Sequence, residues 1–169
     1  MKHAAIFIDE ENIYNWVRHR FTEPESPSKS KRHGLGFHKY FDVNKLWEYL
    51  SERGLKISKA VCFIAQSGLK NPDVVRKLYE WGIDIKPTVR YEYKSLLDPI
   101  MIVEILSTAY ENKHVQTFVI ISGDKDFFPV AKKLRELGKD VVIIGPDEDT
   151  AEILKTNFEY IDVAMLINL

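Results

Sequence analysis

The sequence predicts an α/β protein, a three-layer α/β/α sandwich with a mainly parallel central sheet. Two observations lead to this fold class. Four short apolar runs are separated by segments in which apolar residues recur at helical spacing. Each run is five or six residues long and apolar throughout or after its first residue, which suits a strand covered on both faces. The alternation of strand and helix along the whole chain favours parallel strands joined by right-handed crossovers.

The predicted strands begin close to the N-terminus. The four apolar runs place them at residues 4–8, 60–65, 117–121 and 140–144. A weaker fifth strand is expected at 83–89, where apolar and polar residues alternate and Pro87 interrupts the run. Because proline cannot donate to a neighbouring strand, this fifth segment suits an edge position better than a central one.

The predicted helices lie between these strands. Glycines follow three of them, at Gly54, Gly82 and Gly138, where a helix commonly ends. Pro72 stands near the start of the helix that Gly82 ends, where a missing N–H costs least. The expected helices cover about residues 11–20, 43–50, 72–81, 98–112 and 127–137.

Length and composition indicate one domain, spanning residues 1–169. The chain is 45% hydrophobic and 29% charged, as in an ordinary soluble globular protein. The formal net charge of -1 means that a nucleic-acid site would have to be a local basic patch. The single cysteine, Cys62, lies in an apolar run and is expected to be a buried thiol. No signal peptide or membrane span is apparent, so a cytoplasmic protein is expected.

One segment interrupts the alternation of strands and helices. Residues 22–39 mix Pro, Ser, Gly and basic residues, and they predict a loop inserted after the first helix. It is the most basic stretch of the chain. Two interpretations stay open, a solvated flexible loop and a mobile arm that contacts phosphates. The basic side chains concerned are Lys29, Lys31, Arg32, His33, His38 and Lys39.

Acidic residues follow two of the predicted strands. Asp9 comes directly after the first strand, and the segment Ser122-Gly123-Asp124-Lys125-Asp126 follows the strand at 117–121. In an open parallel sheet, ligands bind at the carboxyl ends of the strands, where the strand order reverses. If these two strands are neighbours at that point, the carboxylates of Asp9 and Asp124 converge on one crevice.

Helix capping could explain some of these acids without a ligand. Asp98 could be the N-cap of a helix over 99–112, and Asp126 could cap a helix that begins at Phe127. Capping leaves Asp9 and Asp124 unexplained beside buried strands, where an unpaired charge is costly. A divalent cation would resolve this, because several carboxylates with water are ligands that Mg²⁺ accepts. Such a site suits phosphodiester hydrolysis.

The remaining acids and histidines are expected to lie outside the functional site. Glu10 and Glu11 are predicted to face solvent at the start of the first helix, where acids favour the helix dipole. His3, His19 and His114 are scattered and are expected to be surface residues. The sequence has no Gly-x-Gly-x-x-Gly after the first strand, no Walker loop and no Cys/His cluster. Dinucleotides, nucleoside triphosphates and zinc are therefore not expected.

Three segments resemble the motifs of a known family. IFIDEENIY, with Asp9 and Asn12 after the first strand, resembles the opening motif of the NYN domains, in the LabA-like branch of the PIN-fold nucleases. ISGDKDFFPVAKKLRELGKDVVIIG resembles the family's Ser-Gly-Asp-x-Asp-Phe-x-Pro segment with the helix and strand after it. KSLLDPIMIVEIL is similar to its middle motif and brings Asp98 onto the third acid. Together the segments span nearly the whole chain.

The resemblance implies a PIN-like fold and a Mg²⁺- or Mn²⁺-dependent ribonuclease site. Asn12 and Ser122 are implied to shape this site and its substrate contacts by hydrogen bonding. In two places the chain departs from the family pattern. Leu96 and Leu97 precede the middle acid in place of a small residue and Val, and Glu104 stands where members often have a further Asp. The implied catalytic residues and metal ligands are Asp9, Asp98, Asp124 and Asp126.

The function expected from the sequence is that of an endoribonuclease. The alternative is a catalytically weak or inactive RNA-binding or regulatory module on the same fold. Carboxylates favour the enzyme, because phosphate binding alone would be better served by Lys and Arg. RNA is the expected partner, with Lys29, Lys31 and Arg32 adding affinity; no membrane is expected, and a homo-oligomer is left open.

Overall fold

A computed structural model describes residues 1–21 and 36–168 of the chain. Its centre is a six-stranded sheet in the order β3-β2-β1-β6-β7-β8, and every neighbouring pair of strands is parallel. The predicted α/β fold with a parallel central sheet is therefore confirmed. The sheet is built from β1 (Lys2–Asp9), β2 (Leu55–Ala65), β3 (Asp84–Thr88), β6 (Val115–Ile121), β7 (Asp140–Gly145) and β8 (Glu159–Asp162).

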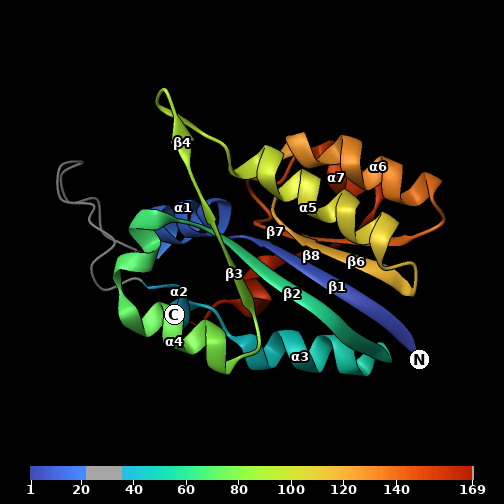
Figure 1. Ribbon diagram of the computed structural model, residues 1–169, viewed down its shortest axis with the longest axis horizontal. Helices are drawn as coiled ribbons and strands as arrows, with labels where there is room; N and C mark the ends of the chain where they lie inside the picture. Colours follow the sequence, from blue (N-terminus) through green and yellow to red (C-terminus); the bar gives the residue numbers. More distant parts are fainter. Residues whose placement is uncertain (22–35, 169) are drawn as a thin grey trace.

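Helices cover both faces of this sheet (Figure 1). One face packs against α1 (Glu10–Phe21), α2 (Phe37–Tyr40), α3 (Val43–Glu52) and α4 (Pro72–Glu80). The other face packs against α5 (Leu97–Glu111), α6 (Phe128–Glu136) and α7 (Glu152–Asn157). Short 3-10 helices lie at η2 (Gln66–Lys70), η3 (Lys125–Phe127) and η4 (Val163–Leu166).

The central strand β1 shows why its sequence is continuously apolar. Successive side chains of a strand point to opposite faces of a sheet. Ile6 and Ile8 pack into the core beneath the α1–α4 layer, whereas Ala5 and Phe7 pack into the core beneath α5, α6 and α7. All four are fully buried. A strand that contributes to two cores has no polar face, so its sequence cannot alternate.

The order of the strands places a crevice between β1 and β6. The connection from β1 runs through α1 on one face, whereas the connection from β6 runs through α6 on the other. These two strands are neighbours in the sheet and have parallel register, with Ile8 opposite Ile121. The strand order reverses at this pair, and the loops leaving their carboxyl ends separate to opposite faces, which opens a binding crevice there.

The edge strand was predicted correctly, and so was the buried cysteine. β3 lies at the outer edge of the sheet with Pro87 in it. Cys62 is fully buried in β2, and burial raises the pKa of its thiol well above the ordinary value. Among residues 1–21 and 36–168, no helix is both long and apolar enough to cross a bilayer.

Three parts of the fold differ from the sequence prediction. The loop predicted at 22–39 ends sooner than expected, because α2 begins at Phe37 and buries both Phe37 and Tyr40. Lys29, Lys31, Arg32 and His33 lie outside the described residues. The C-terminal pair α7 and β8 was not predicted. Neither was a small antiparallel hairpin made of β4 (Arg90–Tyr91) and β5 (Lys94–Ser95).

Candidate active site

A polar cavity of about 230 Å³ lies at the carboxyl ends of β1 and β6. Its walls come from the end of β1, the first turns of α1, the last residue of the hairpin, the start of α5 and the loop after β6. The side chains lining it are almost all acids and amides: Asp9, Glu11, Asn12, Asn15, Ser95, Asp98 and Asp124. Asp9, Asp98, Asp124 and Asp126 were expected to converge in one crevice at this edge of the sheet, and the first three line this cavity.

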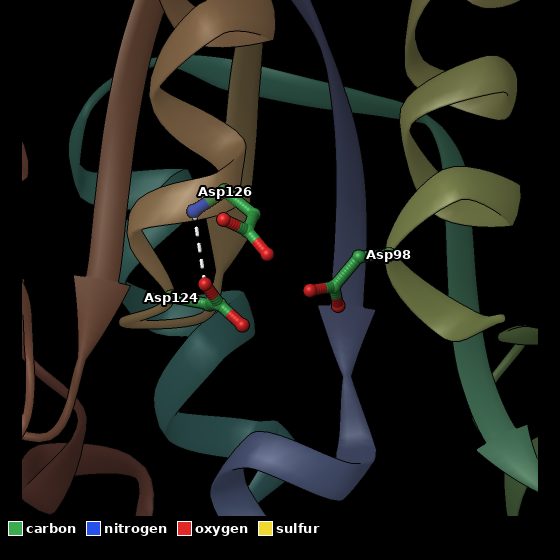
Figure 2. Close-up of side chains that lie close together, drawn as sticks. All are labelled: Asp98, Asp124 and Asp126. Atoms are coloured by element: carbon green, nitrogen blue, oxygen red, sulfur yellow. Dashed lines mark hydrogen bonds between the residues drawn. The ribbon is translucent and has the colours of Figure 1, made fainter. Parts of the chain in front are cut away.

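Three carboxylates lie close together, and two of them line this cavity. Oxygen atoms of Asp98, Asp124 and Asp126 all lie within 4.8 Å of one another. Figure 2 shows Asp98, which comes from the first turn of α5, facing Asp124 and Asp126 on the segment after β6. Three carboxylate ligand atoms at this spacing are a donor set that suits a hard divalent cation such as Mg²⁺ or Mn²⁺.

Asp9 lines the same cavity but lies outside this group of three. Its side chain is 2% exposed. One carboxylate oxygen accepts a hydrogen bond from the backbone N–H of Asn12 at 3.1 Å, and the other accepts from Ser122 Oγ at 2.8 Å. Burial raises the pKa of Asp9 to about 7, although both hydrogen bonds act in the opposite direction.

Asn12 and Ser122 join the two strand ends. Asn12 Oδ1 accepts from the backbone N–H of Gly123 at 3.0 Å, and Ser122 Oγ accepts from the backbone N–H of Asp124 at 3.2 Å. Ser122 is fully buried, whereas Asn12 lines the cavity. These contacts support the expectation that both residues shape the site by hydrogen bonding. For Ser122 they support positioning of Asp9 and Asp124, not direct contact with a substrate.

Gly123 allows the loop after β6 to pack closely on the chain that follows β7. A Cβ atom at this position would lie 2.5 Å from Thr150 Oγ1 and 3.0 Å from Thr150 Cα. The carbonyl of Gly123 also accepts from the backbone N–H of Ala151 at 3.1 Å. Any larger residue would displace the segment that carries Asp124 and Asp126. The Ser-Gly-Asp sequence therefore needs its glycine for packing.

The pKa of Asp98 is raised by its burial and by the neighbouring acids. Burial, the adjacent Asp124 carboxylate and the charges of Asp9 and Asp126 together raise the pKa of Asp98 to about 8. A carboxyl group in this position gives up its proton reluctantly because its neighbours are negative. A bound cation would remove that penalty. The residues present therefore fit a divalent metal ion.

Both capping alternatives for the acids are wrong in detail. Asp124, not Asp126, is the N-cap, and its Oδ1 accepts from the backbone N–H of Asp126 at 2.9 Å. The capped element is the 3-10 helix η3, which precedes α6. Asp98 is not an N-cap either, because α5 begins at Leu97, two residues before the expected start, and Leu96 stands at its N-cap position. The side chains of Asp98 and Asp126 are thus left directed at the cluster (Figure 2).

The prediction for Glu10 and Glu11 was also wrong. Glu10 is 2% exposed and accepts a hydrogen bond from the Tyr40 hydroxyl at 3.4 Å. Glu11 is half-buried and lines the cavity, where Ser95 Oγ donates to its Oε2 at 3.0 Å. Glu11 comes within reach of the site because helical geometry places it beside Asn12 and Asn15 at the mouth of β1.

Glu11, Asn15 and Ser95 are the lining residues that the sequence did not identify. Asn15 stands four positions after Glu11 and three after Asn12, so this polar group one helical turn apart at the start of α1 was the available signal. No sequence pattern indicated that Ser95 would line the cavity, because the β4–β5 hairpin brings it there.

Glu104 does not join the cluster. Its Oε1 lies 2.6 Å from Lys59 Nζ on β2, and its Oε2 lies 4.0 Å from Lys86 Nζ on β3. Six positions further along α5 than Asp98, it has turned toward the outer strands of the sheet. Glu104, which stands where the resembling motif often has a further Asp, therefore forms ion pairs with lysines instead of joining the site.

Comparison with known proteins gives a family and a structural neighbour. The chain is similar to a protein of unknown function from Vibrio parahaemolyticus whose crystal structure superposes with a TM-score of 0.73, at 19% sequence identity. The match covers 99% of this chain and 96% of the other, and the shared fold is PIN-like. No curated protein matches the sequence. The model of the NYN domain family matches residues 3–164, so the chain belongs to the NYN domain family.

Proposed function

We propose that this protein is a metal-dependent endoribonuclease that hydrolyses RNA phosphodiester bonds at its aspartate cluster. NYN domains are generally nucleases and usually use divalent metals. The observation that carries the proposal is the convergence of Asp98, Asp124 and Asp126 within 4.8 Å, at the point where the strand order reverses. The three motifs quoted above support assignment to the LabA-like branch of the family.

The residues that would hold Mg²⁺ or Mn²⁺ are Asp98, Asp124 and Asp126, with Asp9 on the wall of the same cavity. Such an ion supplies a water molecule of lowered pKa and neutralises charge on the phosphate. Asp124 can ligate and cap at once, because only one lone pair of its Oδ1 is needed to accept from Asp126 N. Asp9 can likewise accept its two hydrogen bonds and ligate an ion, since each carboxylate oxygen has two lone pairs.

The chain's own residues have separate tasks in this proposal. Ser122 and the backbone of Asn12 fix the orientation of Asp9, so the carboxylate is positioned before substrate arrives. Asn12 and Asn15 place amide groups in the cavity wall, where N–H donors can bind phosphate oxygens. Glu11, which accepts a hydrogen bond from Ser95, and Asp98 complete the acidic wall.

Acids rather than bases line the cavity, and this favours cleavage over simple binding. A site that only bound phosphate would be served by Lys and Arg, whereas six of the seven lining residues are acids or amides. An inactive RNA-binding module would have no use for three carboxylates that repel one another without a cation.

The test is cleavage of a labelled single-stranded RNA in Mg²⁺ or Mn²⁺. Wild-type protein is expected to cut and EDTA to stop the reaction. Asp98→Asn should slow it by more than the roughly 10- to 100-fold that is typical when a partner of a metal ligand is changed. Asp140→Asn is the matched control, because Asp140 starts β7 at the opposite edge of the sheet. Binding without cation-dependent cleavage by wild type would identify an RNA-binding module instead. Cleavage that persists in EDTA would show that the reaction does not depend on a metal ion.

A further inference from the structure

The β4–β5 hairpin displays two tyrosines in solvent. It follows the edge strand β3 and projects away from the sheet and its helices (Figure 1). Two residues, Glu92 and Tyr93, connect its strands. Tyr93 is 100% exposed and Tyr91 is 67% exposed. Exposed apolar residues scattered singly are normal on a protein surface, whereas two aromatic side chains on one small projection mark a candidate interaction site.

The backbone of the turn is strained in order to hold Tyr93 there. Glu92 has φ of 50° and Tyr93 has φ of 67°, so both lie in the left-handed region. Two-residue hairpin turns of this kind normally use Asn and Gly, which adopt positive φ readily. Among residues 1–21 and 36–168 no other non-glycine residue has positive φ. An unfavourable backbone at an exposed aromatic residue indicates selection for function instead of stability.

The base of the hairpin is attached to the candidate active site. Ser95 Oγ donates to Glu11 Oε2 at 3.0 Å, and the Arg90 guanidinium lies 3.6 Å from Glu11 Oε1. Ser95 and Glu11 both line the acidic cavity. Ser95 Oγ also accepts from the backbone N–H of Leu97 at 3.3 Å, the residue before Asp98. The two tyrosines therefore project from the rim of the cavity that holds the aspartates.

We propose that the hairpin is a docking arm for single-stranded RNA, on which Tyr93 and Tyr91 stack against unpaired bases next to the scissile phosphate. The proposal rests on the proposed function and adds a substrate class to it. Exposed aromatic rings bind bases of any sequence by stacking, and only unpaired bases offer a free face. A protein partner fits less well, because the hairpin's other residues, Arg90, Glu92, Lys94 and Ser95, are all polar.

Charge adds little to this surface. Arg90, Glu92 and Lys94 give the hairpin one net positive charge, and Arg90 is engaged with Glu11. Binding through the hairpin should therefore depend on the rings and be nearly independent of salt. Contacts made by several Lys and Arg side chains would show a steep salt dependence.

The test measures RNA affinity separately from cleavage. Fluorescence anisotropy with a labelled single-stranded RNA and with a duplex of the same sequence is carried out in EDTA. Tyr93→Gly should weaken single-strand binding by about 5- to 150-fold, the range for loss of one base–aromatic stack. It should leave the melting temperature equal or higher, because glycine tolerates positive φ. Tyr93→Phe should bind like wild type.

The control is Tyr79→Ala, because Tyr79 is 84% exposed on α4, on the far side of the molecule from the hairpin (Figure 1). Its affinity should not change. If Tyr93→Gly binds RNA as tightly as wild type, the hairpin proposal is overturned, whether or not the protein cuts RNA. Equal weakening for the duplex would overturn the single-strand assignment. Tyr93-dependent binding in a protein that fails to cut would support the arm and refute the nuclease.

Discussion

The hydroxyl of Ser122 donates a 2.8 Å hydrogen bond to Oδ2 of Asp9, and the two residues are 113 positions apart in the sequence. The bond joins the ends of β1 and β6 at the point where the sheet reverses its strand order. The same hydroxyl oxygen accepts from the backbone of Asp124. One buried side chain thus fixes the relative positions of two acids that the proposed reaction requires.

Replacing Ser122 with Ala should destabilise the protein by about 1–3 kcal/mol, the cost of leaving buried polar groups without partners. The pKa of Asp9 should rise further, because the hydroxyl now favours its charged form. Urea unfolding measures the first effect. Ser51→Ala, on the exposed surface of α3, is the control and should be nearly neutral. Equal stability of Ser122→Ala and wild type would contradict the positioning role.

Asp124→Asn should abolish cleavage while leaving the metal-free protein as stable as wild type, or more stable. Asn caps η3 nearly as well as Asp, and it removes the repulsion with Asp98 and Asp126. The variant should also lose the rise in melting temperature that Mn²⁺ gives wild type by binding the folded state. Full activity of the variant would refute a metal ligand at Asp124. So would a wild-type melting temperature that is the same with and without Mn²⁺.

Affinity for the cation should increase from about pH 6 to about pH 8, because ligand carboxyl groups must lose their protons before they bind. Burial and neighbouring acids raise the pKa of Asp98 to about 8, and burial raises the pKa of Asp9 to about 7. Calorimetric titration with Mn²⁺ in buffers of different ionisation enthalpy would detect the released protons. Affinity that is constant over this range would contradict the assignment.

The same two groups should make the metal-free protein less stable as pH rises. Both have folded-state pKa values above the ordinary 3.8, so between about pH 4 and about pH 8 the folded state binds more protons than the unfolded state. Their contribution to the free energy of unfolding therefore falls across this window. Thermal melts in EDTA at several pH values measure it, and saturating Mn²⁺ should reduce or reverse the slope.

Replacing Lys29, Lys31 and Arg32 with Ala should weaken RNA binding and flatten its dependence on salt. Each phosphate contact that is lost removes a released counterion, so the slope of log affinity against log salt should become less negative by about 1 per contact. Cleavage of saturating RNA in a single turnover should be unchanged. An unaltered salt slope would leave these residues as part of a solvated loop.

The sequence alone predicted the frame of the molecule. Apolar runs at 4–8 and 117–121 indicated strands buried on both faces, and a parallel sheet would bring Asp9 and Asp124 together at one edge if these strands were neighbours, as they are. The strands and the common edge follow from local composition and one topological rule, whereas the structure supplied the condition that β1 and β6 are neighbours. The short strand β8 escaped notice because its sequence, EYID, has no continuous apolar run.

Only the tertiary structure decided which polar side chains enter the site. Glu10 and Glu11 are adjacent acids at the start of one helix, yet Glu10 is enclosed beside Tyr40 and Glu11 faces the cavity with Ser95. Helical periodicity gives the angle between two side chains, but what each of them meets depends on segments distant in sequence, here α2 and the hairpin. The hairpin itself uses Glu and Tyr where turns of its type use Asn and Gly. The environment of these side chains is set by packing between elements, which no local pattern contains.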